Sequence, residues 1–177
     1  KDQNCAYCMG GELLDKFGIY ICDLSVSQLI LFKEQSKLGR VIVAYKDHVS
    51  EIVNISEEER NAFMADVCKA ANAVHKAFNP DKVNYGAYGD TGCHLHMHIV
   101  PKYNGGDEWG GVFQMNPNKT YLTEEQYAEM IEKIKMESAE IADLIDDINF
   151  NIDYRQFVED IYDFDCDMAI ILGGDGT

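Results

Sequence analysis

The feature that most constrains this chain is a run of histidines at every second position, residues 94–101 (HLHMHIVP). The alternation of imidazoles with apolar side chains predicts a β-strand, because successive side chains of a strand point to opposite faces. All three imidazoles are therefore expected on one face of the strand, with Leu95, Met97 and Ile99 on the other. Pro101 is expected to end the strand.

Three aligned imidazoles indicate a functional site rather than ordinary packing. Alternate side chains of a strand stand roughly 7 Å apart at their roots, since a strand rises about 3.3 Å per residue. Their tips can converge on one metal ion or on one phosphate, because neutral imidazole is both a metal ligand and a nucleophile. The spacing alone does not choose between these two kinds of site.

The composition limits the classes of protein to consider. The chain has 177 residues, of which 46% are apolar, and a formal net charge of -16. This is enough apolar material for one domain with an appendage. The negative charge argues against nonspecific binding to nucleic acid or to an anionic membrane. No apolar run approaches a membrane span and the first residues lack a signal-peptide pattern, so a cytoplasmic protein is expected.

The negative charge is concentrated near the end of the sequence. Residues 138–177 hold 11 acidic residues and one basic residue. We therefore expect a folded domain over residues 1–137 and an acidic extension, with two further amphipathic helices, over residues 138–177. An apolar stretch running into Gly173–Thr177 (GGDGT) resembles the phosphate-binding loop of NAD kinases. Because the rest of that fold does not follow, we interpret it as a fragment without kinase activity.

The pattern before residue 137 predicts an α+β fold. Four further segments predict strands beside the histidine strand, at residues 17–22, 27–32, 40–45 and 83–88, and the third of them is rich in β-branched residues. Capping boxes at Ser56–Glu59 and Thr123–Gln126 predict two helices, the first running to about residue 78. We expect an antiparallel sheet of about five strands, with the first helix packed on it and the second helix after the histidine strand.

The histidine run also resembles a known family signature. H-x-H-x-H followed by two apolar residues resembles the motif of the histidine triad superfamily of nucleotide hydrolases and transferases. The resemblance extends through residues 31–48 and 84–90 and covers about residues 1–137. It looks closest to the bacterial branch described as diadenosine-tetraphosphate-type hydrolases. The resemblance implies a homodimer that cleaves a nucleoside polyphosphate or phosphoramidate at the α-phosphorus.

The resemblance also implies a role for each histidine of the triad. His96 would be the nucleophile and would form a covalent nucleotidyl-histidine. His98 and donors from a loop would steady the phosphate oxygens, while His94 would hold zinc or orient its neighbour. Three alternatives stay open: a nucleotidylyltransferase with the same intermediate, a noncatalytic nucleotide sensor, and a metalloenzyme whose metal sits on all three imidazoles.

Four more residues match substrate-binding positions of the family. Asn84 matches a position that contacts the ribose-phosphate region. Arg40 matches a position that faces the nucleotide, where a guanidinium can hold phosphate bidentately, although an ordinary surface arginine is the alternative. Asp90 departs from the family's usual glutamine by exchanging an amide donor for a negative charge, whereas Thr91 still offers a hydroxyl.

A possible metal site begins with the C-x-x-C pair, Cys5 and Cys8. A redox pair of this kind needs a thioredoxin-like βαβ setting, which the sequence lacks, and a zinc site needs two further ligands. The zinc-bearing branches of the family imply His48 and His94 as those ligands. Two thiolates and two imidazoles would close a structural tetrahedral zinc site. The alternative is a reduced pair without metal.

One loop follows the histidine strand directly. Its glycine-rich residues 105–111 contain Trp109, the one tryptophan of the sequence. We expect a plain surface loop here in preference to a substrate lid.

Overall fold

The computed structural model describes residues 1–90, 92–106, 108–117 and 119–150, with side chains as far as residue 137. The chain divides into two compact units, Lys1–Ala142 and Asp143–Thr177. The first unit contains the whole sheet and all three histidines of the triad. Within the described ranges, no helix combines the length and the apolar character that a bilayer span needs.

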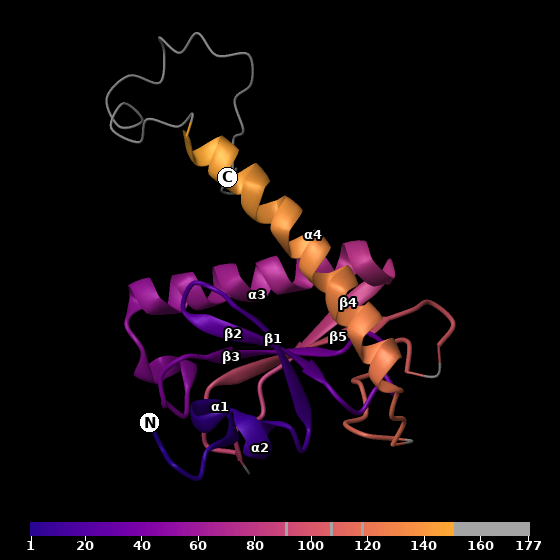
Figure 1. Cartoon of the computed structure of the whole chain (residues 1–177), viewed down its shortest axis with the longest axis horizontal. Coiled ribbons are helices and arrows are strands. Elements are labelled where there is room, and N and C mark those ends of the chain that lie inside the picture. The colour runs from indigo at the N-terminus through magenta and orange to yellow at the C-terminus, as the bar shows by residue number, and fades with distance from the viewer. Residues whose placement is uncertain (91, 107, 118, 151–177) are drawn as a thin grey trace, which may run out of the picture. The chain divides into compact units, whose positions relative to one another are not determined.

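The core of the first unit is one five-stranded antiparallel sheet (Figure 1). Its order is β1-β2-β3-β5-β4, so the histidine strand lies inside the sheet with a partner on each side. The strands are β1 Gly18–Asp23, β2 Ser27–Phe32, β3 Val41–Tyr45, β4 Lys82–Gly86 and β5 His96–Lys102. The predicted α+β class and number of strands are confirmed.

The helices cover both faces of this sheet. Two short helices, α1 Ala6–Met9 and α2 Gly11–Leu14, precede it, and a 3₁₀ turn, Ile52–Asn54, follows β3. The main helix, α3 Glu57–Phe78, comes next, and α4 Glu124–Phe150 follows the triad strand. Both predicted capping boxes form: Ser56 exchanges hydrogen bonds with Glu59, and Thr123 with Gln126.

Helix α3 supplies the larger hydrophobic core. Phe63, Val67 and Val74 are fully buried against one face of the sheet, where they meet side chains such as Leu31 and Ile99. Helix α4 joins the same core through Tyr127, Met130 and Ile134. Burying these side chains is the main stabilising contribution of this half of the domain.

A buried carboxylate ties α3 to the turn between β1 and β2. Asp66 accepts hydrogen bonds from the backbone N–H groups of Ser25 (3.1 Å) and Val26 (2.9 Å) and from the Ser27 hydroxyl (2.6 Å). Its side chain is almost completely buried. The three donors satisfy a charge that would otherwise be costly to bury, and they fix the turn against the helix.

The opposite face of the sheet has a much smaller core. Four buried side chains form it, Leu14, Ile30, Ile42 and Ala44, with three aromatic rings packed alongside. Ala44 and Ile42 are the cross-strand neighbours of His96 and His98. The small apolar cluster therefore covers only part of this face, and the histidines lie beside it on the same face.

The prediction that Pro101 ends the strand was wrong. Strand β5 continues to Lys102, and Pro101 lies opposite Val83 of β4. Pairing with β3 stops at Ile99, so β5 has only one partner beyond that point. Proline is tolerated there because an unpaired strand edge needs no N–H donor.

The helix boundary that the sequence predicted near residue 138 is not present in the structure. The helix that follows the triad strand was expected to be separate from another amphipathic helix beginning near residue 139. Instead α4 is continuous from Glu124 to Phe150. The later predicted helix and Gly173–Thr177 lie outside the described residues.

Candidate functional site

The three histidines lie together on the face of the sheet opposite α3. His96 and His98 belong to β5, and His94 lies just before it. The rings of His96 and His98 have centroids 5.2 Å apart. The Tyr7 ring stacks on His96 at 4.9 Å and lies 5.1 Å from His94. All three imidazoles are at most 6% exposed.

The hydrogen-bond partners of the triad assign a tautomer to each ring. His96 Nδ1 lies 2.6 Å from the carbonyl oxygen of His94, which only accepts, so Nδ1 carries the proton. His94 Nε2 donates in the same way to the carbonyl of Tyr45, 2.7 Å away. His98 Nδ1 lies 3.1 Å from Arg40 Nη2, which only donates, so the proton of His98 is on Nε2. His96 Nε2 and His94 Nδ1 consequently keep free lone pairs.

The surroundings also keep the triad neutral. Burial is the main cause that lowers the pKa of His94 and His96. For His98, burial together with the positive charge of Arg40 lowers the pKa to about 3. An ordinary histidine titrates near 6.5, so these rings are uncharged at neutral pH. A neutral His96 keeps the Nε2 lone pair that a nucleophile requires.

Arg40 is a buried cation next to His98. Its side chain is completely inaccessible, and the guanidinium lies 4.1 Å above the ring of Phe32. Nη1 donates to the carbonyl of Met115 and, at 3.2 Å, to the side-chain oxygen of Asn116. Burial lowers the pKa of Arg40 to about 10, so the guanidinium still carries its charge.

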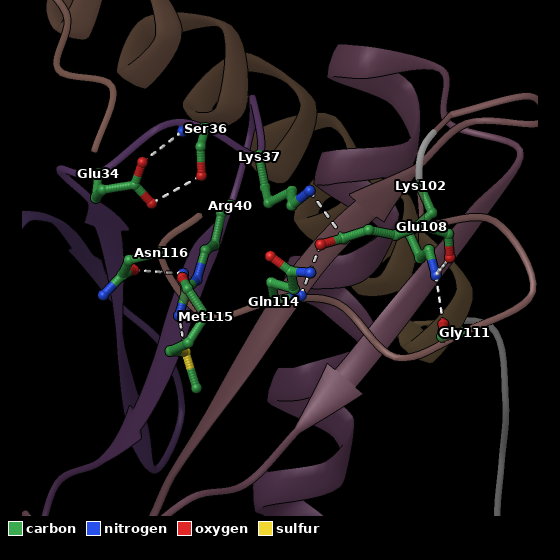
Figure 2. A network of polar contacts seen from close by, with 10 residues as sticks. All are labelled: Glu34, Ser36, Lys37, Arg40, Lys102, Glu108, Gly111, Gln114, Met115 and Asn116. Carbon is green, nitrogen blue, oxygen red and sulfur yellow. Dashed lines mark hydrogen bonds and ion pairs between the residues drawn. The ribbon is translucent and has the colours of Figure 1, made fainter. Parts of the chain in front are cut away.

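The two residues that hold Arg40 belong to a segment after β5, residues 108–117, which we call the strap (Figure 2). Lys102 donates from Nζ to the carbonyls of Glu108 and Gly111. The Glu108 carboxylate pairs with Lys37 at 2.8 Å and accepts from the backbone N–H of Gln114 at 2.7 Å. The Lys102 bonds attach the strap to the end of β5, and the Lys37 ion pair attaches it to the segment that leads into β3.

The four predicted metal ligands form a compact cluster. Ligand atoms of Cys5, Cys8, His48 and His94 all lie within 4.8 Å of one another. Four of the distances between ligand atoms are 3.3–3.6 Å. Cys5 Sγ lies 3.4 Å and Cys8 Sγ 3.6 Å from His94 Nδ1, Cys8 Sγ lies 3.3 Å from His48 Nδ1, and the two Nδ1 atoms are 3.3 Å apart.

This cluster fits a tetrahedral zinc ion. Zinc bonds of about 2.3 Å to sulfur and 2.0 Å to nitrogen separate the ligand atoms by roughly 3.3–3.8 Å. His94 already presents the free lone pair of Nδ1 to the cluster, because its Nε2 proton is held by the Tyr45 carbonyl. On the outer side of His48, Nε2 lies 3.9 Å from a carboxylate oxygen of Asp2.

Of the remaining predicted site residues, Asn84 lies on the strand next to the triad strand. Asn84 pairs with Val100, the next residue of β5 on the histidine face, and is partly buried. Asp90 is exposed on the loop between β4 and β5. Thr91 lies outside the described residues.

Two small pockets lie beside the triad. One, of about 100 Å³, is lined by His96 and Tyr88 among others. The second, of about 130 Å³, is lined by Phe17, Phe32, Glu34 and Asn116 with three further residues, Lys16, Lys119 and Tyr121. Phe32 contacts the His98 ring edge to face, with centroids 5.8 Å apart. Each pocket is smaller than the roughly 300 Å³ at which ligand pockets usually begin.

The sequence did not point to several residues of this site. Tyr7 falls between the two cysteines, and its ring was not expected to cover His96. Phe32 was assigned only to a strand, and Met115 and Asn116 to no feature at all. The aromatic residues at the ends of two predicted strands, Phe17 and Phe32, are the one sequence signal that could have indicated the second pocket.

Comparisons with known proteins agree with this arrangement. The model of the HIT domain matches residues 28–105. The chain is 30% identical over 125 residues to "Protein hit" of Bacillus subtilis, covering 63% of this chain and 80% of that protein. A histidine triad protein from Marinobacter aquaeolei superposes with a TM-score of 0.66 at 20% identity, over 76% of this chain and 98% of the other. A zinc-bound histidine triad family protein from Mycobacterium smegmatis gives a TM-score of 0.53 at 20% identity, over 72% and 88%.

Proposed function

Because this chain belongs to the histidine triad family, we propose that it hydrolyses a nucleoside polyphosphate or phosphoramidate at the α-phosphorus. Family membership supports nucleotide binding in general. The hydrolytic reaction is supported chiefly by one observation, the hydrogen bond from His96 Nδ1 to the His94 carbonyl. That bond leaves Nε2 as an unprotonated nucleophile on a neutral ring.

The reaction takes two displacements. His96 Nε2 attacks the α-phosphorus, an N–P bond forms, and the bond to the leaving oxygen or nitrogen breaks with its electron pair. The leaving group takes a proton from solvent where it needs one. Water then attacks the same phosphorus and gives up a proton to solvent, the N–P bond breaks with its electron pair returning to Nε2, and a nucleoside monophosphate leaves with His96 restored. Imidazole suits both steps, since it is a good nucleophile when neutral and a good leaving group when protonated.

The neighbouring residues act on the phosphate. His98 donates from Nε2–H to a phosphate oxygen, since its Nδ1 is occupied by Arg40. We assign substrate binding to the family positions held by Asn84, Arg40, Asp90 and Thr91, of which Asp90 departs from the usual glutamine. A polar side chain such as Asn84, on the histidine face of β4, supports this assignment.

The nucleoside is placed in the pocket beside Phe32. Two aromatic rings, Phe17 and Phe32, line this pocket together with the polar side chains of Glu34 and Asn116. Aromatic walls suit a base, and polar side chains suit a sugar. The phosphates would then extend toward His98, which Phe32 contacts.

We also infer that Cys5, Cys8, His48 and His94 bind a structural zinc ion. The separations of the four ligand atoms and the free lone pair of His94 Nδ1 support this. The zinc-bound relative of the same fold adds support. A site closed by four protein ligands has no open position for substrate, so the ion would stabilise the fold and supply no step of the reaction.

The mechanism is tested by replacing His96 with asparagine. Turnover of diadenosine tetraphosphate should fall by about a thousandfold or more, roughly 4 kcal/mol of transition-state stabilisation, with nucleotide binding largely kept. The control is His75→Asn, which changes an exposed histidine on α3. Rapid quenching of the wild-type reaction followed by peptide mass spectrometry should place a nucleotidyl adduct on His96. Near-normal turnover of His96→Asn, or an adduct on His98, would contradict the proposal.

Two further experiments identify the acceptor of the nucleotidyl group and the oligomeric state of the protein. Competing phosphate acceptors added to the reaction separate hydrolysis from nucleotidyl transfer, because both share the adduct. The homodimer implied by the family is tested by light scattering of the full chain.

A further inference from the structure

Arg40 is a buried cation without a direct anionic partner, although the charge of Glu34 acts on it at longer range. Among the described residues, no ion pair includes Arg40. The nearby Glu34 carboxylate accepts instead from the backbone N–H groups of Ser36 and Thr120, both at 2.9 Å, and from the Ser36 hydroxyl. Burying a cation without an anion is costly, and proteins usually avoid it.

The hydrogen bonds of the guanidinium are also incomplete. Nη1 has two oxygen acceptors, and Nη2 has the nitrogen of His98 and the sulfur of Met115, which is a weak acceptor. Nε is buried and has no hydrogen-bond partner among the described residues. A phosphate would offer charged oxygens to such a fork of donors, and Arg–phosphate pairs are commonly bidentate.

The strap occupies the place that such an anion would take. Met115 and Asn116 supply the two oxygens and the sulfur that the guanidinium now contacts. Asn116 also lines the pocket beside Phe32, which has only about 130 Å³. Because the Arg40 side chain is completely buried, an anion can reach the guanidinium only when residues that cover it, Met115 and Asn116 among them, move away.

We propose that the Arg40 guanidinium binds a second phosphoryl group, at a position that we call the seat. Met115 and Asn116 of the strap occupy this position until a nucleotide displaces them. The inference rests on the proposed function. The phosphate that reacts with His96 meets His98 at Nε2, whereas Arg40 contacts the opposite ring nitrogen, Nδ1. Because these contacts lie on different sides of the His98 ring, we assign Arg40 to a phosphoryl group other than the one that reacts. The seat selects nucleotides with at least two phosphoryl groups over monophosphates and simple phosphoramidates.

The test compares nucleotide affinities in the His96→Asn background, where turnover does not interfere. Binding of ADP and of AMP is measured by calorimetry with Arg40 intact and with Arg40→Gln. We expect Arg40→Gln to weaken ADP binding about tenfold or more while AMP binding changes less than threefold. The charge-matched control, Lys133→Gln on α4, should change neither affinity. Equal effects on ADP and AMP, or no effect on either, would overturn the proposal.

Tryptophan fluorescence can follow the displacement of the strap by a nucleotide. Trp109, the one tryptophan of the sequence, lies in the strap, so its fluorescence follows the strap without a label. ADP should change the Trp109 emission more than AMP does. Glu108→Gln removes the ion pair with Lys37 and should tighten ADP binding severalfold by loosening the strap. An unchanged or weakened ADP affinity in folded Glu108→Gln protein would contradict displacement of the strap.

Two controls keep the result interpretable. Circular dichroism identifies an Arg40→Gln protein that does not fold. In that event Arg40→Lys, which keeps the charge but not the bidentate fork, should still lose ADP affinity selectively. Wild-type turnover is measured separately. Selective ADP binding without turnover would refute the proposed hydrolysis and leave the seat standing, whereas turnover without Arg40 selectivity would do the reverse.

Discussion

Because His98 is buried in its neutral form, acid should lower the free energy of unfolding by an amount that depends on this residue. Its pKa is about 3 in the folded protein and near 6.5 in the unfolded chain, so the unfolded chain takes up the proton first. The stability that depends on His98 is therefore complete above pH 6.5 and is lost as the pH falls toward 3. Between pH 7.5 and pH 4.5, the pH falls about two units below the pKa of the unfolded chain, and the free energy of unfolding should fall by about 3 kcal/mol.

The perturbation that isolates this contribution is His98→Asn. Asparagine does not titrate, and its side-chain oxygen still accepts from Arg40. Urea denaturation at pH 7.5 and pH 4.5 gives the free energy of unfolding of each protein. We expect the wild type to lose about 3 kcal/mol more between the two pH values than the variant does.

The comparison has a matched control. Any effect of acid on the cysteine-histidine cluster is shared by both proteins and cancels in the difference. His75→Asn, on the exposed side of α3, should lose as much stability as the wild type. If His98→Asn also loses as much as the wild type, His98 is not held neutral by burial and Arg40, and the tautomer argument fails with it.

Three other predictions concern the fold. Asp66→Ala removes the acceptor of three buried hydrogen bonds and should lower the free energy of unfolding by about 2–4 kcal/mol in urea, while Glu58→Ala on the exposed start of α3 changes it little. Freshly purified protein should carry about one zinc per chain, and a chelator should lower its melting temperature more than its turnover rate; metal analysis that finds no zinc would refute the site. Cutting the chain after residue 137 should leave a soluble, active protein, because Tyr127, Met130 and Ile134, the buried residues in the part of α4 whose side chains the structure describes, precede the cut; an insoluble product would show that the remainder completes the core.

Local patterns predicted most of the fold. Strand alternation and capping boxes depend on neighbours a few residues apart, so the five strands and the start of α3 are within one or two residues of expectation. Pro101 was misjudged because its tolerance depends on where β3 stops, which is a property of the pairing rather than of β5. The same limit applies to the unbroken α4, whose sequence around residue 138 contains no helix breaker.

The sequence predicted only those residues of the candidate site that belong to a recognisable motif. The triad and the cysteine pair are compact in sequence, whereas Arg40 meets Met115 and Asn116 across about 75 residues. No local pattern indicates that a guanidinium will be buried beneath a loop that lacks acidic partners for it. Tyr7 was missed for a related reason, because its stacking on His96 follows from how α1 packs and not from the C-x-x-C spacing.

The pairing of β5 has a consequence for how this chain tolerates change. His98 stands opposite Ile42 on one side and Gly86 on the other, and His96 stands opposite Ala44. A shift of β5 by one residue against these neighbours would turn every side chain to the other face of the sheet. The imidazoles would then lie under α3, and Leu95, Met97 and Ile99 would face Tyr7. An insertion or deletion of one residue in the loop before β5 is therefore a change of chemistry as much as of length, because register alone decides whether this strand presents a nucleophile or a hydrocarbon.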